Sequence, residues 1–313
     1  MAEQRGAAPD MIQTVDFLFS FCREREPDRG LDSFLYALNC SAALIGCFGG
    51  YGEERSFPGL KGRTGPWLAA RAAAAAYMDR FEQSDGRASA ELPSAKAMLL
   101  QYLKTCRDRG VGPDAPGTGL SCSAAVALCQ PGRVGTDVQL QWVGSARAYL
   151  LDEEGLCQLT QDDRGGLDAM DALCRAAPPQ SLVSLEREFE LHTARLSVSR
   201  PGLLFTATDG CMAGLTTPME LEDRILRCLM AASNVKEMEA TLSKCLGEQG
   251  GDCALSGLGL GFGGFDAMKR RLAGRARQMH RDYIEGLDAC SPEEKQLLWE
   301  HYRDGYHRLL SQI

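Results

Sequence analysis

The chain has 313 residues and a mass of 34.0 kDa, with 44% hydrophobic and 24% charged residues. This composition is typical of a globular domain and excludes a disordered tail, a collagen and a coiled-coil rod. No segment approaches the roughly 18 consecutive apolar residues that a membrane span needs, and no apolar leader follows the first residues. The net charge of −8 is opposite to that of a general nucleic-acid binder. We therefore expect a cytoplasmic protein with no membrane or nucleic-acid partner.

The thirteen cysteines are scattered along the chain, and none forms a C-x-x-C pair. This spacing gives no support to a zinc ribbon or a thioredoxin-type site. Cys47, Cys129 and Cys228 fall within apolar runs, where a free cysteine behaves as a small hydrophobic residue. We expect reduced, buried thiols.

The first half of the chain predicts three strands followed by two adjacent helices. Alternating or continuous apolar runs predict strands over residues 11–20, 32–38 and 42–48. A glycine-rich loop is predicted over 49–65, and Pro66 then stands at a favourable first position of a helix. The helices are expected over 67–81 and 93–107, where apolar residues recur at helical spacing.

The second half predicts antiparallel strands interrupted by helices. Asp152-Glu153-Glu154-Gly155 has the composition of a hairpin turn between two short apolar runs. The predicted strands are 121–129, 137–143, 147–151, 156–159, 191–198, 203–207 and 254–261. Helices are expected near 167–174 and over 219–232 and 235–246.

The pattern changes after residue 264, which divides a body over 1–264 from a helical hairpin over 265–313. One apolar stripe predicts a single long helix from Phe265 to Leu287, and Ser291-Pro292-Glu293-Glu294 is a capping-box start for the next helix. Residues 265–281 carry six basic residues against one acidic residue. This basic run predicts either docking or dimerisation through the hairpin, or an ordinary solvated helix face.

Seven short motifs follow one another along residues 12–262. They are LDSF (31–34), GCFGGYG (46–52), GPWLAA (65–70), WVGSARAY (142–149), LCQLT (156–160), LFTATDG (204–210) and GGDCA (250–254). In this order they resemble the metal-dependent protein phosphatases of type 2C, especially the bacterial branch. The resemblance implies an α+β fold: a four-layer α-β-β-α sandwich of two antiparallel sheets flanked by helices. The C-terminal helical hairpin would be an addition to it.

The resemblance also implies where metal ions would bind. In that family one Asp bridges two metal ions, and the carbonyl of the next Gly and three further Asp residues complete the protein ligands. Oxygen ligands of this kind suit Mg²⁺ and Mn²⁺, and two such ions generate a hydroxide for phosphoryl transfer. The matching positions here are Asp32, Gly50, Asp209 and Asp252.

Several positions depart from the family pattern. Gly49 stands where the bridging Asp belongs, so the oxygen shared by both metals is missing. Ser145 replaces the Asp of G-D-S-R, and Cys253 replaces the second acid or amide of the closing motif. Leu31 replaces an acidic or amide residue, and Pro27 stands at the position of the phosphate-binding Arg, which leaves Arg25 and Arg29 as neighbouring candidates.

These departures favour a catalytically impaired serine/threonine phosphatase-like protein, a pseudophosphatase. We expect it to hold at most one Mg²⁺ or Mn²⁺ ion and to act by binding a phosphoprotein or a regulatory protein. The alternative is an active Mg²⁺- or Mn²⁺-dependent enzyme with an altered metal site, in which a metal-activated water attacks phosphoserine or phosphothreonine. Such an enzyme would use one metal ion or a substitute acid, for which Glu53 and Glu54 are candidates.

Overall fold

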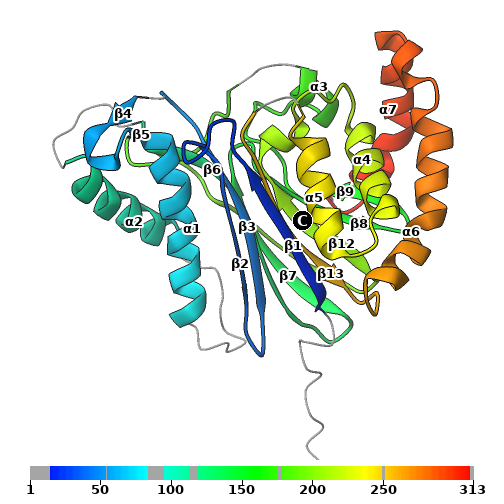
Figure 1. Cartoon of the computed structure of the whole chain (residues 1–313), viewed down its shortest axis with the longest axis horizontal. Helices are drawn as coiled ribbons and strands as arrows, with labels where there is room; N and C mark the ends of the chain where they lie inside the picture. Colours follow the sequence, from blue (N-terminus) through cyan, green and yellow to red (C-terminus); the bar gives the residue numbers. More distant parts are fainter. Residues whose placement is uncertain are drawn as a thin grey trace, which may run out of the picture.

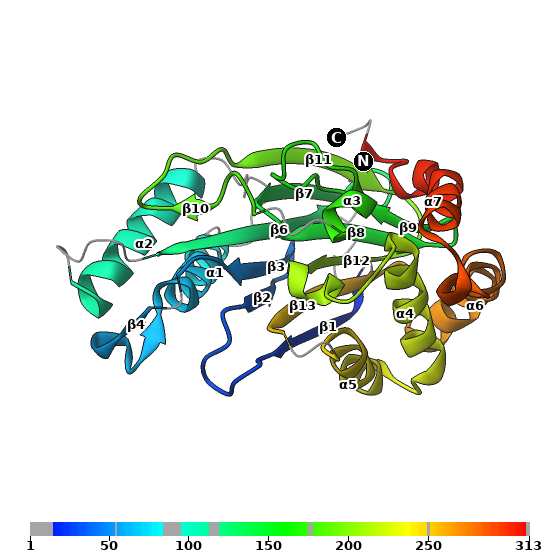
Figure 2. The same ribbon diagram turned by 90° about the horizontal axis from the view of Figure 1, so that it is seen from above.

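The computed structural model describes residues 15–53, 55–83, 95–112, 119–174, 178–248 and 251–310. Their strands form two antiparallel sheets that face each other, with helices on both outer sides (Figures 1 and 2). The predicted four-layer α-β-β-α sandwich is therefore confirmed. None of the described helices carries an apolar stretch of the length that a bilayer requires. The first four residues of the predicted strand over 11–20 lie outside the described residues.

The first sheet has five strands. Its order is β1 (Val15–Arg23), β13 (Cys253–Leu260), β12 (Gly202–Ala207), β8 (Arg147–Asp152) and β9 (Gly155–Gln158). The first and last strands of the body thus lie side by side, with Val15 opposite Leu260 and Arg23 opposite Cys253. This pairing joins segments that are more than 200 residues apart in the sequence within one sheet.

The second sheet has six strands. The order along its main path is β11 (His192–Val198), β7 (Thr136–Val143), β6 (Ser121–Pro131), β3 (Ala43–Gly50) and β2 (Ser33–Leu38), and β10 (Val183–Ser184) pairs with β6. A small hairpin of β4 (Ser56–Phe57) and β5 (Arg63–Thr64) lies in the segment predicted as a loop. Two-residue strands carry no periodicity that the sequence reveals.

Helices α1 (Gly65–Gln83) and α2 (Ala95–Gly110) cover the second sheet, and α4 (Pro218–Ala231) and α5 (Val235–Leu246) cover the first (Figure 2). The short helix α3 (Ala169–Cys174) follows β9. The alanine run of α1 explains its close packing, because small side chains let the helix approach β3 and β6. Six of these alanines belong to the core between α1 and the sheet: Ala69, Ala70, Ala72, Ala73, Ala74 and Ala76.

The C-terminal helices differ from the prediction in one respect. The single long helix expected from Phe265 to Leu287 ends at Met279, which closes α6 (Phe265–Met279). A π-helical turn over His280–Ile284 follows, and Gly286, with φ of 82°, turns the chain back. Tyr283 nevertheless stays on the apolar stripe because its ring packs against Tyr302, with centroids 5.3 Å apart.

The last helix, α7 (Pro292–Tyr306), begins with the predicted capping box. Its apolar face carries Trp299, Tyr302 and Tyr306, which are buried in the same core as α4 and α5. Several cations of the basic run on α6 are bound within the chain: Arg275 pairs with Glu222 and Arg271 with Glu153. Docking or dimerisation through the hairpin stays a prediction, and the buried aromatic face would not be available for it.

Candidate functional site

One edge of the sandwich gathers the four residues predicted as metal ligands. Asp32 precedes β2, Gly50 ends β3, Asp209 follows β12 and Asp252 precedes β13. Antiparallel pairing brings these ends together, because Ser33 lies opposite Phe48 and Ala207 lies opposite Leu255. The charges of Asp209 and Asp252 both act on Asp32. The structure therefore assembles the predicted set, and its role in metal binding stays a prediction.

Asp32 lies deepest of the three carboxylates, with 6% of its surface exposed. The pKa of Asp32 is raised from its ordinary value of 3.8 to about 7, chiefly by burial, and the charges of Asp209 and Asp252 act in the same direction. Hydrogen bonds from the Thr208 hydroxyl and the Gly50 amide act in the opposite direction and lower this pKa. Without a cation, Asp32 thus holds its proton up to neutral pH.

This raised pKa predicts a specific pH dependence of stability. The folded protein binds the proton of Asp32 more tightly than the unfolded chain does. The resulting stabilisation is complete below about pH 4 and is lost as the pH rises through about 7. We expect the free energy of unfolding to fall over this window by up to roughly 1.4 kcal/mol per pH unit from this residue. Urea denaturation should show a flatter profile for Asp32→Asn. Equal slopes for the two proteins would contradict the prediction.

The position of the missing bridging ligand is closed by packing. A Cβ atom on Gly49 would lie 2.8 Å from Oγ of Ser123 and 3.6 Å from Oδ1 of Asp32. Ser123 is buried on β6, and its hydroxyl donates a hydrogen bond to the Gly49 carbonyl over 3.4 Å. A Cβ on Gly50 would lie 2.7 Å from the carbonyl oxygens of Leu31 and Pro66. The surrounding backbone therefore requires glycine at position 50, whereas a side chain at position 49 would require the Ser123 hydroxyl to move.

Asp209 is bound by two side chains of this protein. Oδ2 of Asp209 accepts hydrogen bonds from Ser145 over 3.0 Å and from Arg164 over 2.8 Å. Arg164 also donates to the Ala172 carbonyl, and 11% of its side chain is exposed. Its Nε lies 3.8 Å from Asp162, which pairs with the buried Arg147. A fixed guanidinium thus stands beside the carboxylate that would otherwise face a cation.

Asp252 holds a loop in place. Oδ1 of Asp252 accepts the backbone N–H of Arg25 over 2.7 Å, and Oδ2 accepts that of Leu31 over 2.9 Å. Cys253 is buried in the core, where its thiol interacts with that of Cys211. Glu53 is exposed, and Glu54, the other proposed substitute acid, lies outside the described residues.

The donor set does not fit a divalent cation in its present arrangement. In the described part of the chain, no group of three or more His, Cys, Asp or Glu side chains is placed to hold a metal ion. Hydrogen-bond donors from the protein already engage Asp32, Asp209 and Asp252. A metal ion would have to displace Arg164 or the loop that Asp252 holds.

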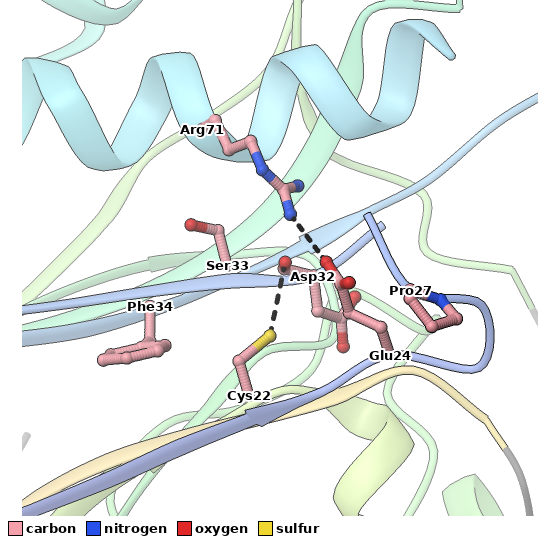
Figure 3. Close-up of a pocket in the computed structure, with 7 residues that line it drawn as sticks. All are labelled: Cys22, Glu24, Pro27, Asp32, Ser33, Phe34 and Arg71. Carbon is pink, nitrogen blue, oxygen red and sulfur yellow. Dashed lines mark hydrogen bonds and ion pairs between the residues drawn. The ribbon is translucent and has the colours of Figure 1, made fainter. Parts of the chain in front are cut away.

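A cavity of about 440 Å³ opens beside Asp32, between β1, β2 and α1. Figure 3 shows Arg71 pointing from α1 toward Glu24, with Pro27 to the right of Glu24. Arg71 pairs with Glu24 over 3.2 Å and lies 4.3 Å from the centroid of the Trp67 ring. A helix thus supplies a guanidinium near Pro27, the position of the missing phosphate-binding Arg.

The sequence motifs did not identify Arg71, Ser123 and Arg164 as residues of the site. Arg71 lies within an alanine-rich helix, and Arg164 lies in the polar segment after β9. No residue pattern linked them to the aspartates, because their contacts join segments far apart in the chain.

If Arg164 takes the place of a cation, its removal should expose Asp209. We expect Arg164→Met to raise the affinity for Mn²⁺ roughly tenfold or more, the size of effect that residues around a metal site commonly have. Isothermal titration with Mn²⁺ measures this directly. The exposed Arg187 offers a matched control, Arg187→Met, which should bind Mn²⁺ as the unaltered protein does. Unchanged affinity in Arg164→Met would contradict the role of Arg164.

The arrangement of sheets and helices is shared with solved phosphatase structures. The phosphatase Stp1 from Staphylococcus aureus superposes with a TM-score of 0.57 at 13% identity, covering 79% of this chain and 96% of that chain. The PPM Ser-Thr phosphatase MsPP from Mycobacterium smegmatis gives 0.53 at 13% identity, covering 79% and 100%. The catalytic domain of PstP, solved in complex with two manganese ions, gives 0.51 at 16% identity, covering 79% and 98%.

These likenesses establish the fold: the chain has the architecture of the PPM-type, or type 2C, serine/threonine phosphatases. No sequence-family model and no curated protein sequence matches the chain.

Proposed function

We propose that this protein is a type-2C phosphatase-like protein with little or no phosphatase activity, which acts by binding a phosphoprotein or a regulatory protein. The main support for the proposal is that no space is left for a side chain at Gly49. A Cβ atom on Gly49 would lie only 2.8 Å from Oγ of Ser123. A bridging carboxylate is what holds two metal ions close enough to act on one phosphoryl group. Its replacement by a packed glycine removes that means of catalysis.

The engaged carboxylates support the same conclusion. Asp209 is neutralised by Arg164 over 2.8 Å, and Asp252 is used to hold the loop that follows β1. A charged guanidinium repels a divalent cation at the same carboxylate. The cavity beside Asp32 keeps the guanidinium of Arg71, a group that suits phosphate, while the bridging carboxylate is missing at Gly49.

The alternative, an active enzyme with an altered metal site, is favoured by one observation. Asp209 and Asp252 lie near enough to Asp32 for their charges to raise its pKa. A cation that displaced Arg164 from Asp209 would be attracted by the same carboxylates.

Hydrolysis of a phosphothreonine peptide tests the two functions against each other. We expect no turnover with Mn²⁺ or Mg²⁺ at millimolar concentration. Metal-dependent turnover that Asp209→Asn abolishes would overturn the proposal and establish the active enzyme. Turnover that persists in Asp209→Asn would indicate a contaminating phosphatase, and the assay is then repeated on repurified protein.

A further inference from the structure

A second pocket lies where the end of α7 meets β8, β9 and α3. Its volume is about 310 Å³, and small-molecule sites in proteins begin at roughly 300 Å³. The turn after α7 contributes His307 and Leu310, so the pocket includes a part of the predicted C-terminal hairpin. We call it the α3–α7 pocket.

Arg164 contacts both the wall of the α3–α7 pocket and the predicted metal site. Its guanidinium donates to Asp209 over 2.8 Å and to the carbonyl of Ala172, which lines the pocket, over 3.0 Å. Asp162 also lines the pocket, and its Oδ2 lies 3.8 Å from Nε of Arg164. None of the four predicted metal ligands lines the pocket, so it presents a separate set of groups.

Two of the charged groups at the wall compensate each other. Asp162 accepts hydrogen bonds from Nε of Arg147 over 2.8 Å and from Nη2 over 2.7 Å, one on each carboxylate oxygen. Both side chains are buried, with at most 6% exposed. Such a bidentate pair is geometrically specific and strong. Arg147 and Asp162 together therefore offer no net charge to a ligand.

Asp168 is the remaining charge at the wall, and no ion pair compensates it within the described part of the chain. Its Oδ1 accepts the N–H of Met170 over 2.8 Å, which leaves Oδ2 available. Burial lowers the pKa of His307 below its ordinary value of 6.5, so this ring is neutral at pH 7. Arg303 and Asp304 also act on His307, and their opposite charges offset each other. The pocket thus carries one net negative charge.

The rest of the wall is mainly apolar or already satisfied. Gln158 donates to the Thr160 carbonyl and accepts the Tyr306 hydroxyl, so both ends of its amide are used within the chain. A metal ion such as Ca²⁺ takes about six or more oxygen ligands, which one free carboxylate oxygen does not supply. An organic cation needs one carboxylate and an apolar surface for its body. The apolar residues of the wall are Leu167, Ala169, Ala172 and Leu310.

We propose that the α3–α7 pocket binds a small organic cation, an amidinium, guanidinium or ammonium group on an apolar body, with Asp168 as its counter-ion. This site goes beyond the proposed function, because it requires neither a phosphoprotein nor a metal ion. Its cation would contact the C-terminal hairpin through His307 and Leu310.

Isothermal titration of the full chain in EDTA tests the proposal. Benzamidine, benzamide and benzoate have nearly the same shape and carry a positive, a zero and a negative charge. We expect benzamidine to bind at least about tenfold more tightly than benzamide, the effect of one charge-assisted hydrogen bond, and benzoate to bind most weakly. Butylammonium and butanol form a second, aliphatic pair, in which the cation should again bind more tightly.

Three variants test the role of Asp168. Asp168→Asn keeps an oxygen that can accept the Met170 N–H but removes the charge, so the preference for benzamidine over benzamide should be lost. Gln161→Glu adds an acid at an exposed position of the wall and should strengthen benzamidine binding about threefold. Asp79→Asn, at an exposed position of α1, makes the same charge change elsewhere and should leave binding unchanged.

The carboxylates of the predicted metal site could also attract an organic cation, and Asp209→Asn distinguishes the two places. Binding lost in Asp209→Asn but kept in Asp168→Asn would assign the cation to the predicted metal site and overturn the proposal. Benzamide binding as tightly as benzamidine, or no binding of benzamidine at about 10 mM, would overturn it as well. Thermal melting of each variant confirms that it is folded.

Discussion

Restoring a carboxylate at position 49 should raise the affinity for Mn²⁺ roughly tenfold or more, provided that the Ser123 hydroxyl is removed at the same time. The combination Gly49→Asp and Ser123→Ala achieves both, because Oγ of Ser123 lies 2.8 Å from the place of the new Cβ. The new carboxylate would lie beside Asp32, whose Oδ1 is 3.6 Å from that Cβ. Isothermal titration with Mn²⁺ measures the affinity.

The two single variants are the controls for this experiment. Gly49→Asp alone should be less stable and should gain less affinity, because Ser123 is buried and its hydroxyl must move within a packed core. Ser123→Ala alone adds no ligand and should leave Mn²⁺ binding unchanged. A dissociation constant for the combined variant equal to that of the unaltered protein would show that packing at Gly49 is not what prevents metal binding.

The second large effect concerns the attachment of the C-terminal helices. Arg275→Met should lower the free energy of unfolding by about 3 kcal/mol or more, since it leaves a buried carboxylate without its cation. Glu222 is fully buried, and its two oxygens accept hydrogen bonds from Arg275 over 2.5 and 3.0 Å. Tyr302 and the backbone of Leu156 also donate to Glu222, so the network joins α4, α6, α7 and β9. Urea denaturation measures the loss.

An exposed ion pair on the same helix provides the comparison. Arg271 pairs with Glu153 over 3.1 Å, and about half of each side chain is exposed. Arg271→Met should therefore cost less than about 1 kcal/mol. Adding Glu222→Gln to Arg275→Met should recover part of the loss by removing the unpaired charge. Equal costs for Arg271→Met and Arg275→Met would contradict the importance of the buried pair.

Much of the fold was predictable because local patterns agree with the tertiary structure. The predicted helix over 235–246 coincides with α5, and Ser291 caps α7 as its spacing indicates. The four-layer sandwich followed from the order of the motifs and is confirmed. The helix predicted from Phe265 to Leu287 was wrong beyond Met279, because an apolar stripe shows which face is buried but not where the backbone turns.

The candidate site was predictable only in part. The motifs located Asp32, Gly50, Asp209 and Asp252, and the structure brings them to one edge of the sandwich. What engages those carboxylates was not visible in the sequence. Arg164 reaches Asp209 across 45 positions of the chain, and no local signal marks such a contact.

The sequence by itself determined the class of fold, the positions of the remaining acids and the absence of an Asp at residue 49. These properties depend on residue identity and on periodicity along the chain. Only the tertiary structure decided that Ser123 closes the space at Gly49 and that Arg164 neutralises Asp209. Each of these arises where segments distant in sequence meet, and their packing and charge depend on how the strands and loops are placed in space.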